Sequence, residues 1–339
     1  MNIIHGLSAV GPFSRSVLTI GNFDGVHLAH QRLIGEAHVL AAKAAAPVVV
    51  LTFDPHPQKI LAPQRAPLPL MPLTERLRIL AELGVDFAAV ARSEPALLSM
   101  DAETFIRDVV WDKFQPVYVV EGPSFGFGRG RKGNPELLSQ LAPRYGFNVC
   151  IVPSVTVRLA QEPRVVSSSL IRELLELGNI EAAAQCLGRP YALWGNVVRG
   201  QERGRTIGFP TANLATADQV IPGDAVYAGL TSMEQDCWKC AISVGPAATF
   251  ERHERVVEAH LLDFQGDLYG RTLRVDFIAR LRDQRRFEST DMLVRQLHED
   301  VEKTQRVLQT PACPGDEVSP TVEDQLPSSK CRFSGGRAA

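Results

Sequence analysis

The chain has 339 residues, a formal net charge of −2 at pH 7, and 45% hydrophobic against 22% charged residues. Such values are typical of a soluble globular protein with room for two domains, and they imply no global field for nucleic acid or an anionic membrane. We see no apolar run long enough for a transmembrane helix and no secretory signal pattern at the N-terminus. The cysteines are scattered, which fits a reducing cytoplasm.

Short apolar runs alternate with helical patterns in the first half of the chain. The runs are continuously apolar, as in strands that are buried on both faces of a sheet. They occupy residues 16–21, 48–53, 85–91, 117–122 and 149–153. Apolar residues between them recur at helical spacing, so the alternation predicts an α/β fold with a doubly wound parallel sheet.

A proline-rich segment at residues 54–72 interrupts this rhythm. Its six prolines argue against a regular helix or a central strand. The segment begins where a buried strand ends, which is the edge at which open α/β sheets bind ligands. We therefore predict a loop or flap over that site.

The pattern of the sequence changes after residue 190. Two short helices that end in glycine are predicted within 165–190. Beyond them, short segments separated by glycine and proline predict a small antiparallel barrel or sandwich, which a helical pattern at 289–308 closes. The last thirty or so residues lack periodicity and are rich in Pro, Ser and Gly. We expect two domains and a disordered tail, at 1–186, 187–309 and 310–339.

Two histidines follow the first predicted strand, in the stretch "GNFDGVHLAH". A glycine turn leads there into a helix, and the free N–H groups of a helix start favour an anion. His27 and His30 share one face of the first helical turn. Two imidazoles at this place can donate to phosphate oxygens as charge builds on a leaving group. The alternative is two surface histidines on an ordinary helix start.

A second phosphate-binding pattern is "SSSLIR" at the start of a later helix. One serine is explained as an N-cap, but three serines, Ser167, Ser168 and Ser169, followed by Arg172 exceed what capping needs and favour a phosphate clamp over plain capping. The loop "EGPSFGFGRGRKGN" adds basic residues and two rings, Phe125 and Phe127, that are able to stack on a flat ligand. Glycine-rich basic loops are also often simple flexible surface.

Two patterns in the second half suit a metal and phosphate site. In "VVRGQERGRTIGFPTAN", a turn with Gly204 and Gly208 precedes Thr211 and Asn213. The hydroxyl and amide of these last two residues face one side of a strand and are ligands suited to Mg²⁺ and phosphate. In "VVEAHLLDFQGDLYG", Glu258 is a candidate general base, with a solvated strand face as the alternative. The lone "CWKC" favours structural cysteines over a metal or redox site.

The order and identity of these motifs resemble the bacterial bifunctional riboflavin kinase/FAD synthetase family. The resemblance runs from Leu18 to Arg306 and rests on "GNFDGVHLAHQ", "TFDPHP", "FGFGRGRKG", "SSSLIR", "GRTIGFPTAN", "EAHLLDFQGDLYG" and "RLRDQRRFES". It implies a Rossmann-like nucleotidyltransferase domain that joins the adenylyl group of ATP to FMN, giving FAD and pyrophosphate. It also implies an antiparallel β-barrel with a C-terminal helix that phosphorylates riboflavin to FMN, using ATP and Mg²⁺.

The resemblance also implies roles for individual residues. In the first domain, the histidines that contact the ATP phosphates are His27 and His30. The adjoining nucleotide-binding turn is Asn22, Phe23 and Gly25, and the second phosphate signature is Ser167, Ser168 and Arg172. In the second domain, Thr211 and Asn213 match the residues at Mg²⁺ and ATP, and Glu258 matches the base that takes the proton of the riboflavin 5′-hydroxyl.

Some positions depart from the family pattern. Ala29 and Ser124 in the first domain replace a glycine and an Asp or Asn, and Ser243 and Ala248 in the second replace Asn and Pro. The leading hypothesis is a bifunctional cytoplasmic enzyme whose partners are ATP, riboflavin and FMN, with no nucleic acid or membrane. The alternatives are a riboflavin kinase whose first domain has lost adenylyl transfer, and a flavin- or nucleotide-binding regulatory module. The oligomeric state stays open.

Overall fold

The computed structural model describes residues 1–11, 13–200, 203–216, 218–233, 236–246, 255–309 and 332–333. The chain forms two compact units. The first comprises Met1–Pro67, Leu73–Val166 and Val322–Ala339, and the second comprises Leu68–Pro72 and Ser167–Thr321. The helix pair that precedes the barrel is thus grouped with the second unit, while the domain boundary at residue 187 stays a prediction. The expected tail lies outside the described residues, except for 332–333.

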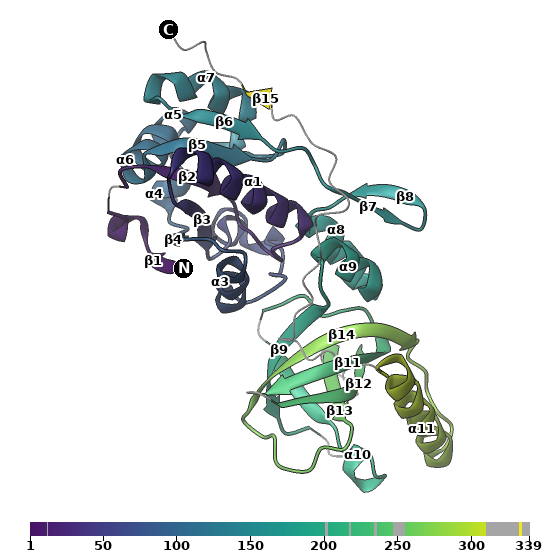
Figure 1. Ribbon diagram of the computed structural model, residues 1–339. Helices are drawn as coiled ribbons and strands as arrows, with labels where there is room; N and C mark the ends of the chain where they lie inside the picture. Colours follow the sequence, from purple (N-terminus) through teal and green to yellow (C-terminus); the bar gives the residue numbers. More distant parts are fainter. Residues whose placement is uncertain are drawn as a thin grey trace. The chain divides into compact units, whose positions relative to one another are not determined.

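A parallel sheet forms the centre of the first unit (Figure 1). Its strands are β1 (Asn2–His5), β2 (Ser16–Ile20), β3 (Val48–Asp54), β4 (Phe87–Arg92), β5 (Pro116–Glu121) and β6 (Asn148–Ile151). They lie in the order β1-β4-β3-β2-β5-β6, and β15 (Arg332–Phe333) pairs antiparallel with β6. β2 and most of β3 are buried. The predicted doubly wound parallel sheet is therefore confirmed.

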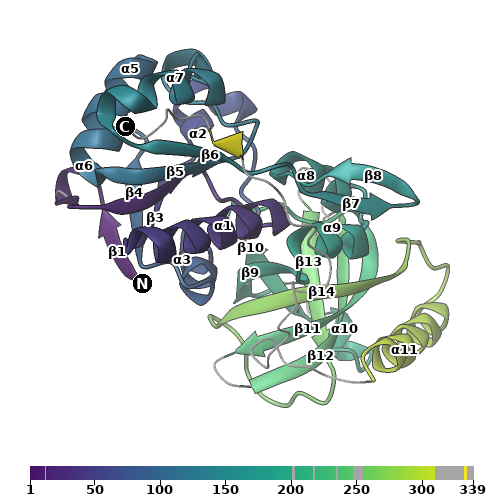
Figure 2. The same ribbon diagram turned by 45° about the horizontal axis from the view of Figure 1, so that its top comes forward.

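Helices cover both faces of this sheet (Figures 1 and 2). They are α1 (Leu28–Ala44), α2 (Pro57–Leu61), α3 (Leu73–Glu82), α4 (Pro95–Leu98), α5 (Ala102–Phe105), the π-helical segment η3 (Ile106–Trp111), α6 (Asp112–Phe114) and α7 (Pro135–Tyr145). Short 3₁₀ turns and a hairpin complete the unit: η1 (Leu7–Ala9), η2 (Pro63–Arg65), η4 (Arg129–Arg131), β7 (Thr156–Leu159) and β8 (Glu162–Val165). α1 buries Ile34, Ala37 and Leu40 against the sheet, as its apolar spacing predicts.

The proline-rich segment contains a short helix, so the prediction of a loop throughout is wrong. α2 begins at Pro57, and proline is well suited to the first turn of a helix because its missing N–H is not needed there. His56 caps this start, since its Nδ1 accepts the backbone N–H of Gln58 at 3.1 Å. Proline spacing alone therefore excludes a long helix but not a single turn.

The strand order of the sheet reverses between β2 and β5. The pairing of these two strands ends at Leu18 and Val119. Beyond that point β2 stays with β3, because Gly21 N–H donates to the Leu51 carbonyl at 3.0 Å. β5 stays with β6, because Val152 N–H donates to the Glu121 carbonyl at 2.8 Å. The strands therefore part at their carboxyl ends, in a fork of the kind at which open α/β sheets bind ligands.

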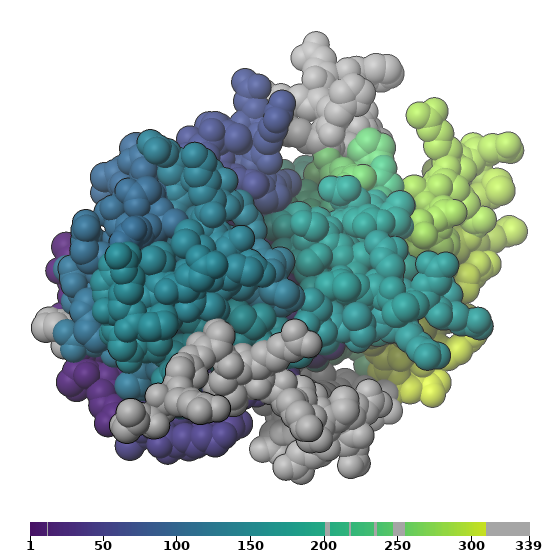
Figure 3. Space-filling view, turned by 90° about the horizontal axis from the view of Figure 1, so that it is seen from above, coloured from purple at the N-terminus to yellow at the C-terminus, as the bar shows by residue number. Residues whose placement is uncertain are grey.

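Six antiparallel strands close into a barrel in the second unit, in the order β10-β13-β12-β11-β14-β9. They are β9 (Tyr191–Val198), β10 (Ala212–Thr216), β11 (Ala225–Met233), β12 (Asp236–Pro246), β13 (Arg255–Leu261) and β14 (Thr272–Arg282). The helices are α8 (Ser168–Glu176), α9 (Ile180–Leu187), α10 (Arg203–Thr206) and α11 (Thr290–Val307), the last of which is seen in yellow-green at the surface in Figure 3. The expected barrel with a closing helix is confirmed. Among the described residues, no helix has both the length and the apolar character that a membrane span requires.

A buried ion pair fastens α11 to the barrel. Arg282, at the end of β14, donates through Nε and Nη2 to the two carboxylate oxygens of Asp300 at 2.9 and 2.7 Å. Gln296 donates to the same carboxylate at 2.9 Å. The Asp300 side chain is only 2% exposed and the Arg282 side chain 15%, so the carboxylate has no bulk water to replace the guanidinium.

Arg282→Met is expected to lower the free energy of unfolding of the second unit by about 3–5 kcal/mol, because Asp300 is left buried and charged. Urea unfolding followed by circular dichroism measures this change. Asp283→Asn is the matched control: it removes an ion pair to Arg280 in which the Asp283 side chain is 83% exposed. Its expected cost is below about 1 kcal/mol. Equal small costs in both variants would contradict the role of the buried pair.

Candidate functional site

The turn between β2 and α1 brings the first set of predicted site residues together. Gly25 has a φ of +84°, and Phe23 also has a positive φ, of +48°, which bends the chain sharply into α1. The rings of His27 and His30 stack with centroids 3.7 Å apart, and Phe23 lies 4.9 Å from the ring of His30. His27 is the N-cap residue of α1. Both imidazoles therefore lie where the free N–H groups and the dipole of a long helix favour an anion.

Asn22 links this turn to the proline-rich segment. The side-chain nitrogen of Asn22 lies 2.9 Å from Nε2 of His56. The backbone carbonyl of Asn22 accepts a hydrogen bond from Thr52 Oγ1 at 3.1 Å. His56 belongs to the quoted motif "TFDPHP" but has no predicted role. The two contacts hold the turn after β2 against the end of β3, on one side of the fork.

Arg76 is a buried cation near the same strand ends that has no predicted role. It lies on α3, is 5% exposed, and donates through Nη1 to the Phe53 carbonyl at 3.1 Å. Burial lowers the pKa of Arg76, and the charges of Asp24 and Asp54 oppose that effect. Because arginine stays charged in proteins, it balances these carboxylates. The signal in the sequence is an arginine on the buried face of an amphipathic helix.

The glycine-rich basic loop after β5 is organised by its own contacts. Phe127 is 5% exposed and packs in the core beside Phe105, which makes it a poor platform for a ligand. A Cβ on Gly133 would lie 2.6 Å from the Phe127 ring, so this glycine serves packing. Arg131 donates through Nη2 to the Ser124 carbonyl at 2.9 Å. Phe125, half-buried and stacked on Phe127, is the ring that keeps an open side.

The "SSSLIR" segment opens α8 in the second unit. Ser167 is the N-cap of α8, because its Oγ accepts the N–H of Leu170 at 3.2 Å. Arg172 donates through Nε to the Leu68 carbonyl at 2.8 Å. Ser167, Ser168 and Arg172 thus belong to a different compact unit from the two histidines. Their joint action with His27 and His30 stays a prediction.

Two of the predicted kinase residues, Asn213 and Glu258, form a row with Ser243 on the outer face of the barrel wall. Asn213 on β10 lies directly across from Glu258 on β13, and Glu258 lies directly across from Ser243 on β12. The residues between them along each strand, such as Ala212 and Ala259, are buried in the barrel interior. Directly opposed side chains have Cβ atoms about 5 Å apart. An amide, a carboxyl and a hydroxyl are therefore presented side by side.

The glycine-rich turn before β10 packs directly on this row. A Cβ on Gly200 would come within 2.3 Å of Asn213 Nδ2, and one on Gly204 within 2.2 Å of the Phe209 carbonyl oxygen. Gly208 has a φ of +86°, in the region that favours glycine. Thr211 follows the turn and is exposed. Residues 201–202 and 247–254, which border this site in the sequence and include Ala248, lie outside the described part.

Glu258 is partly buried on the barrel wall, and Ser243 beside it is held by a hydrogen bond. Burial raises the pKa of the Glu258 carboxyl above the ordinary value, toward the range in which a general base works best. Gln284 supports the neighbouring Ser243: its Nε2 donates to Ser243 Oγ at 2.9 Å and to the Val244 carbonyl at 3.0 Å. Gln284 belongs to "RLRDQRRFES" and has no predicted role.

His260 holds the turn that carries Thr211. Its Nδ1 donates to the Pro210 carbonyl at 2.7 Å. The ring of Phe209 lies 5.4 Å from the ring of His260 and 4.9 Å from that of His298 on α11. Side chains from β13 and α11 thus fix the "FPTAN" motif from two sides.

The "CWKC" cysteines lie on the barrel strand β12. Cys237 and Cys240 are three residues apart on β12, so their side chains point to opposite faces of the strand. Cys240 is fully buried, and burial raises the pKa of its thiol well above the ordinary value. Within the described ranges, no group of three or more His, Cys, Asp or Glu residues is arranged to hold a metal ion.

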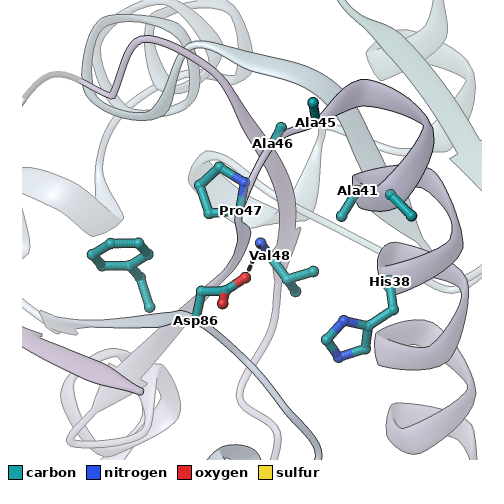
Figure 4. A pocket seen from close by; sticks show the side chains of 9 residues that line it. His38, Ala41, Ala45, Ala46, Pro47, Val48 and Asp86 are labelled. Carbon is teal, nitrogen blue, oxygen red and sulfur yellow. Dashed lines mark hydrogen bonds between the residues drawn. The ribbon is translucent and has the colours of Figure 1, made fainter.

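A shallow hollow of about 470 Å³ lies elsewhere on the first unit (Figure 4). It is lined by His38 and alanines from the end of α1, and by Val48 and Asp86. Val48 N–H donates to the Asp86 carboxylate at 2.8 Å, and His38 Nε2 lies 2.8 Å from the Leu83 carbonyl. The hollow is at the amino ends of β3 and β4, whereas the histidine turn follows the carboxyl end of β2. It is therefore separate from the candidate site.

The class of protein is a two-domain one: a Rossmann-like α/β fold with two stacked imidazoles at the turn after β2, and a small closed barrel with a carboxyl group beside an amide and a hydroxyl. A family model described as FAD synthetase matches residues 12–169, and one described as riboflavin kinase matches residues 187–308.

Similar proteins match nearly the whole chain. "Bifunctional riboflavin kinase/FMN adenylyltransferase" of Escherichia coli (strain K12) is 37% identical over 298 residues, which cover 88% of this chain and 94% of the relative. The protein of the same name from Bacillus subtilis (strain 168) is 31% identical over 299 residues, which cover 86% of this chain and 92% of the relative. A solved structure named "Macrolide-efflux Protein", from Streptococcus pneumoniae, has a TM-score of 0.80 at 33% identity, over 90% of this chain and 99% of that chain.

The chain belongs to the bifunctional riboflavin kinase/FMN adenylyltransferase family. It carries both domains of that family, and with them riboflavin kinase and FMN adenylyltransferase activities that use ATP. The family, the fold class and the bifunctional character expected from the motifs are confirmed.

Proposed function

We propose that the first unit transfers the adenylyl group of ATP to FMN at the fork between β2 and β5, and that the barrel phosphorylates riboflavin at the row of Asn213, Glu258 and Ser243. The stacked imidazoles of His27 and His30 at the start of α1 are the observation that carries the first half. The proposal for the barrel is supported by the position of Glu258, which lies between an amide and a hydroxyl on neighbouring strands.

The free cysteines among the described residues support a cytoplasmic location.

In adenylyl transfer, a phosphate oxygen of FMN attacks the α-phosphorus of ATP. The bond from that phosphorus to the bridging oxygen breaks, and pyrophosphate leaves with the electron pair. His27 and His30 donate hydrogen bonds to the leaving oxygens, so that they stabilise charge as it develops. Asn22, Phe23 and Gly25 shape the turn around the nucleotide. We assign Ser167, Ser168 and Arg172 as the second phosphate-binding group, and residues 1–186 as the domain responsible.

In riboflavin phosphorylation, Glu258 takes the proton of the 5′-hydroxyl. The resulting oxygen attacks the γ-phosphorus of ATP, and ADP leaves. Thr211 and Asn213 offer a hydroxyl and an amide oxygen, which are hard ligands that fit Mg²⁺. Bound there, Mg²⁺ would neutralise charge on the transferred phosphate. Gly204 and Gly208 let the backbone approach the phosphates, and we assign residues 187–309 to this reaction.

The direct test is to incubate the purified protein with riboflavin, ATP and Mg²⁺ and to separate the flavins by chromatography. We expect FMN to appear first and FAD to follow, with pyrophosphate released in equal amount to FAD. FMN without FAD, even from added FMN, would restrict the protein to the kinase reaction. Absence of both products would contradict the proposal as a whole.

Gly200→Ala is expected to lower kcat/KM for FMN formation about 10²-fold. The new Cβ would lie 2.3 Å from Asn213 Nδ2 and so displace the amide, and a misplacement of about 1 Å in a reacting assembly can cost that much. Initial rates with riboflavin and ATP measure the effect, and FAD formation from added FMN in the same preparation is the control. An unchanged kcat/KM for FMN formation would show that Asn213 is not needed at its observed position.

A further inference from the structure

Glu121 is a buried carboxyl group for which the proposed reactions have no use. It is the last residue of β5 and is 2% exposed. Its Oε1 accepts the backbone N–H of Ile20 at 2.7 Å. A side chain of one strand thus bonds to the backbone of its neighbour at the place where the two strands part.

The direction of the Ile20 N–H explains this contact. Along a strand, successive N–H groups point to opposite neighbours. Gly21 N–H donates to Leu51 on β3, so Ile20 N–H points toward β5. The backbone ladder between β2 and β5 has ended at Leu18 and Val119, so the backbone of β5 no longer supplies the acceptor. The Glu121 carboxyl replaces the missing backbone acceptor across the fork.

The Glu121 carboxyl is buried away from water. Burial raises the pKa of Glu121 well above its ordinary value, and the hydrogen bond from Ile20 opposes that effect only in part. A glutamine would keep an acceptor oxygen for the Ile20 N–H in a side chain of nearly the same size. A leucine would fill a similar volume but leave the Ile20 N–H buried without its partner.

We propose that Glu121 is a positioning residue for adenylyl transfer: its carboxyl group bridges the fork between β2 and β5 and fixes the direction in which the chain enters the turn that carries Asn22 and leads to His27 and His30. The bonded N–H belongs to Ile20, one residue before that turn begins at Gly21. The proposed site lies at the fork, and His27 and His30 lie at the start of α1. The direction that the chain takes from Ile20 to α1 therefore decides where the two imidazoles are placed. This inference rests on the proposed function of the first unit.

The test compares Glu121→Gln with Glu121→Leu in the full-length protein, with kcat and KM measured for FAD formation from FMN and ATP. We expect Glu121→Gln to stay within about threefold of the wild-type kcat, and Glu121→Leu to lose about 10- to 100-fold in kcat with a smaller change in KM, because misplacement acts on the reacting geometry. FMN formation by the barrel is the internal control and should not change. Wild-type kcat in Glu121→Leu, or equal losses in both variants, would overturn the proposal.

Amide hydrogen exchange of residues 20–26 supplies a readout that does not depend on activity. We expect slow exchange at Ile20 in the wild type and in Glu121→Gln, and faster exchange in Glu121→Leu. Unaltered exchange in Glu121→Leu would overturn the positioning role. Absence of FAD formation in the wild type would instead contradict the proposed function, and the exchange data would still decide whether Glu121 holds the turn.

Discussion

Glu258→Gln is expected to lower the rate of FMN formation by about 10²–10⁴-fold, the usual contribution of a general base. The amide cannot take the proton of the riboflavin hydroxyl, although it matches the carboxyl in size and still faces Asn213 and Ser243 across the strands. FAD formation from added FMN should be unchanged, because that reaction is assigned to residues 1–186, outside the barrel. Initial rates of both reactions in one preparation measure the two effects together.

A pH profile adds a second expectation for the same residue. The base must be deprotonated to act, and burial raises the pKa of Glu258 above its ordinary value of 4.5. The kcat/KM of the wild type for riboflavin should therefore fall as the pH drops through a pKa above 4.5, and the residual activity of Glu258→Gln should lack this limb. Glu302→Gln, on the exposed side of α11, is the matched control. Equal losses in the two glutamine variants would rule out Glu258 as the base.

The fold of both units could be predicted because their signals are local. β2 and β3 are buried on both faces and read as unbroken apolar runs, and the buried face of α1 follows from its spacing. Elements whose signal is weak were missed. β1 is a short, mostly exposed edge strand, and the hairpin of β7 and β8 is also largely exposed, so neither shows a buried pattern.

Within the candidate site, the sequence predicts only those residues that short-range helix or strand geometry brings together. His27 and His30 are three residues apart, and Thr211 and Asn213 two, so helix and strand geometry bring each pair together. Contacts between distant segments carry no such signal. The partner of Glu258 on β12 depends on barrel register, and the bond from Glu121 to Ile20 depends on where two strands part. These are consequences of topology, which no short motif encodes.

His30→Ala is expected to lower FAD formation from FMN and ATP by about 10²–10³-fold, the cost of removing one donor that stabilises a developing negative charge. The substitution also removes the ring against which His27 stacks at 3.7 Å and Phe23 at 4.9 Å. Because the rings support one another, His27→Ala combined with His30→Ala should cost little more than either change alone. Riboflavin phosphorylation by the barrel should be spared in all three variants.

His38→Ala is the matched control for this prediction, since it makes the same change on the same helix. His38 lies two turns further along α1 and contacts the Leu83 carbonyl beside the hollow rather than the fork. Any general loss of α1 stability should therefore appear in both variants, whereas loss of charge stabilisation should appear only in His30→Ala. Comparable loss of FAD formation in the two variants would point to helix stability as the cause. Equal loss of FMN and FAD formation in a folded His30→Ala protein would contradict the assignment of the two reactions to separate sites.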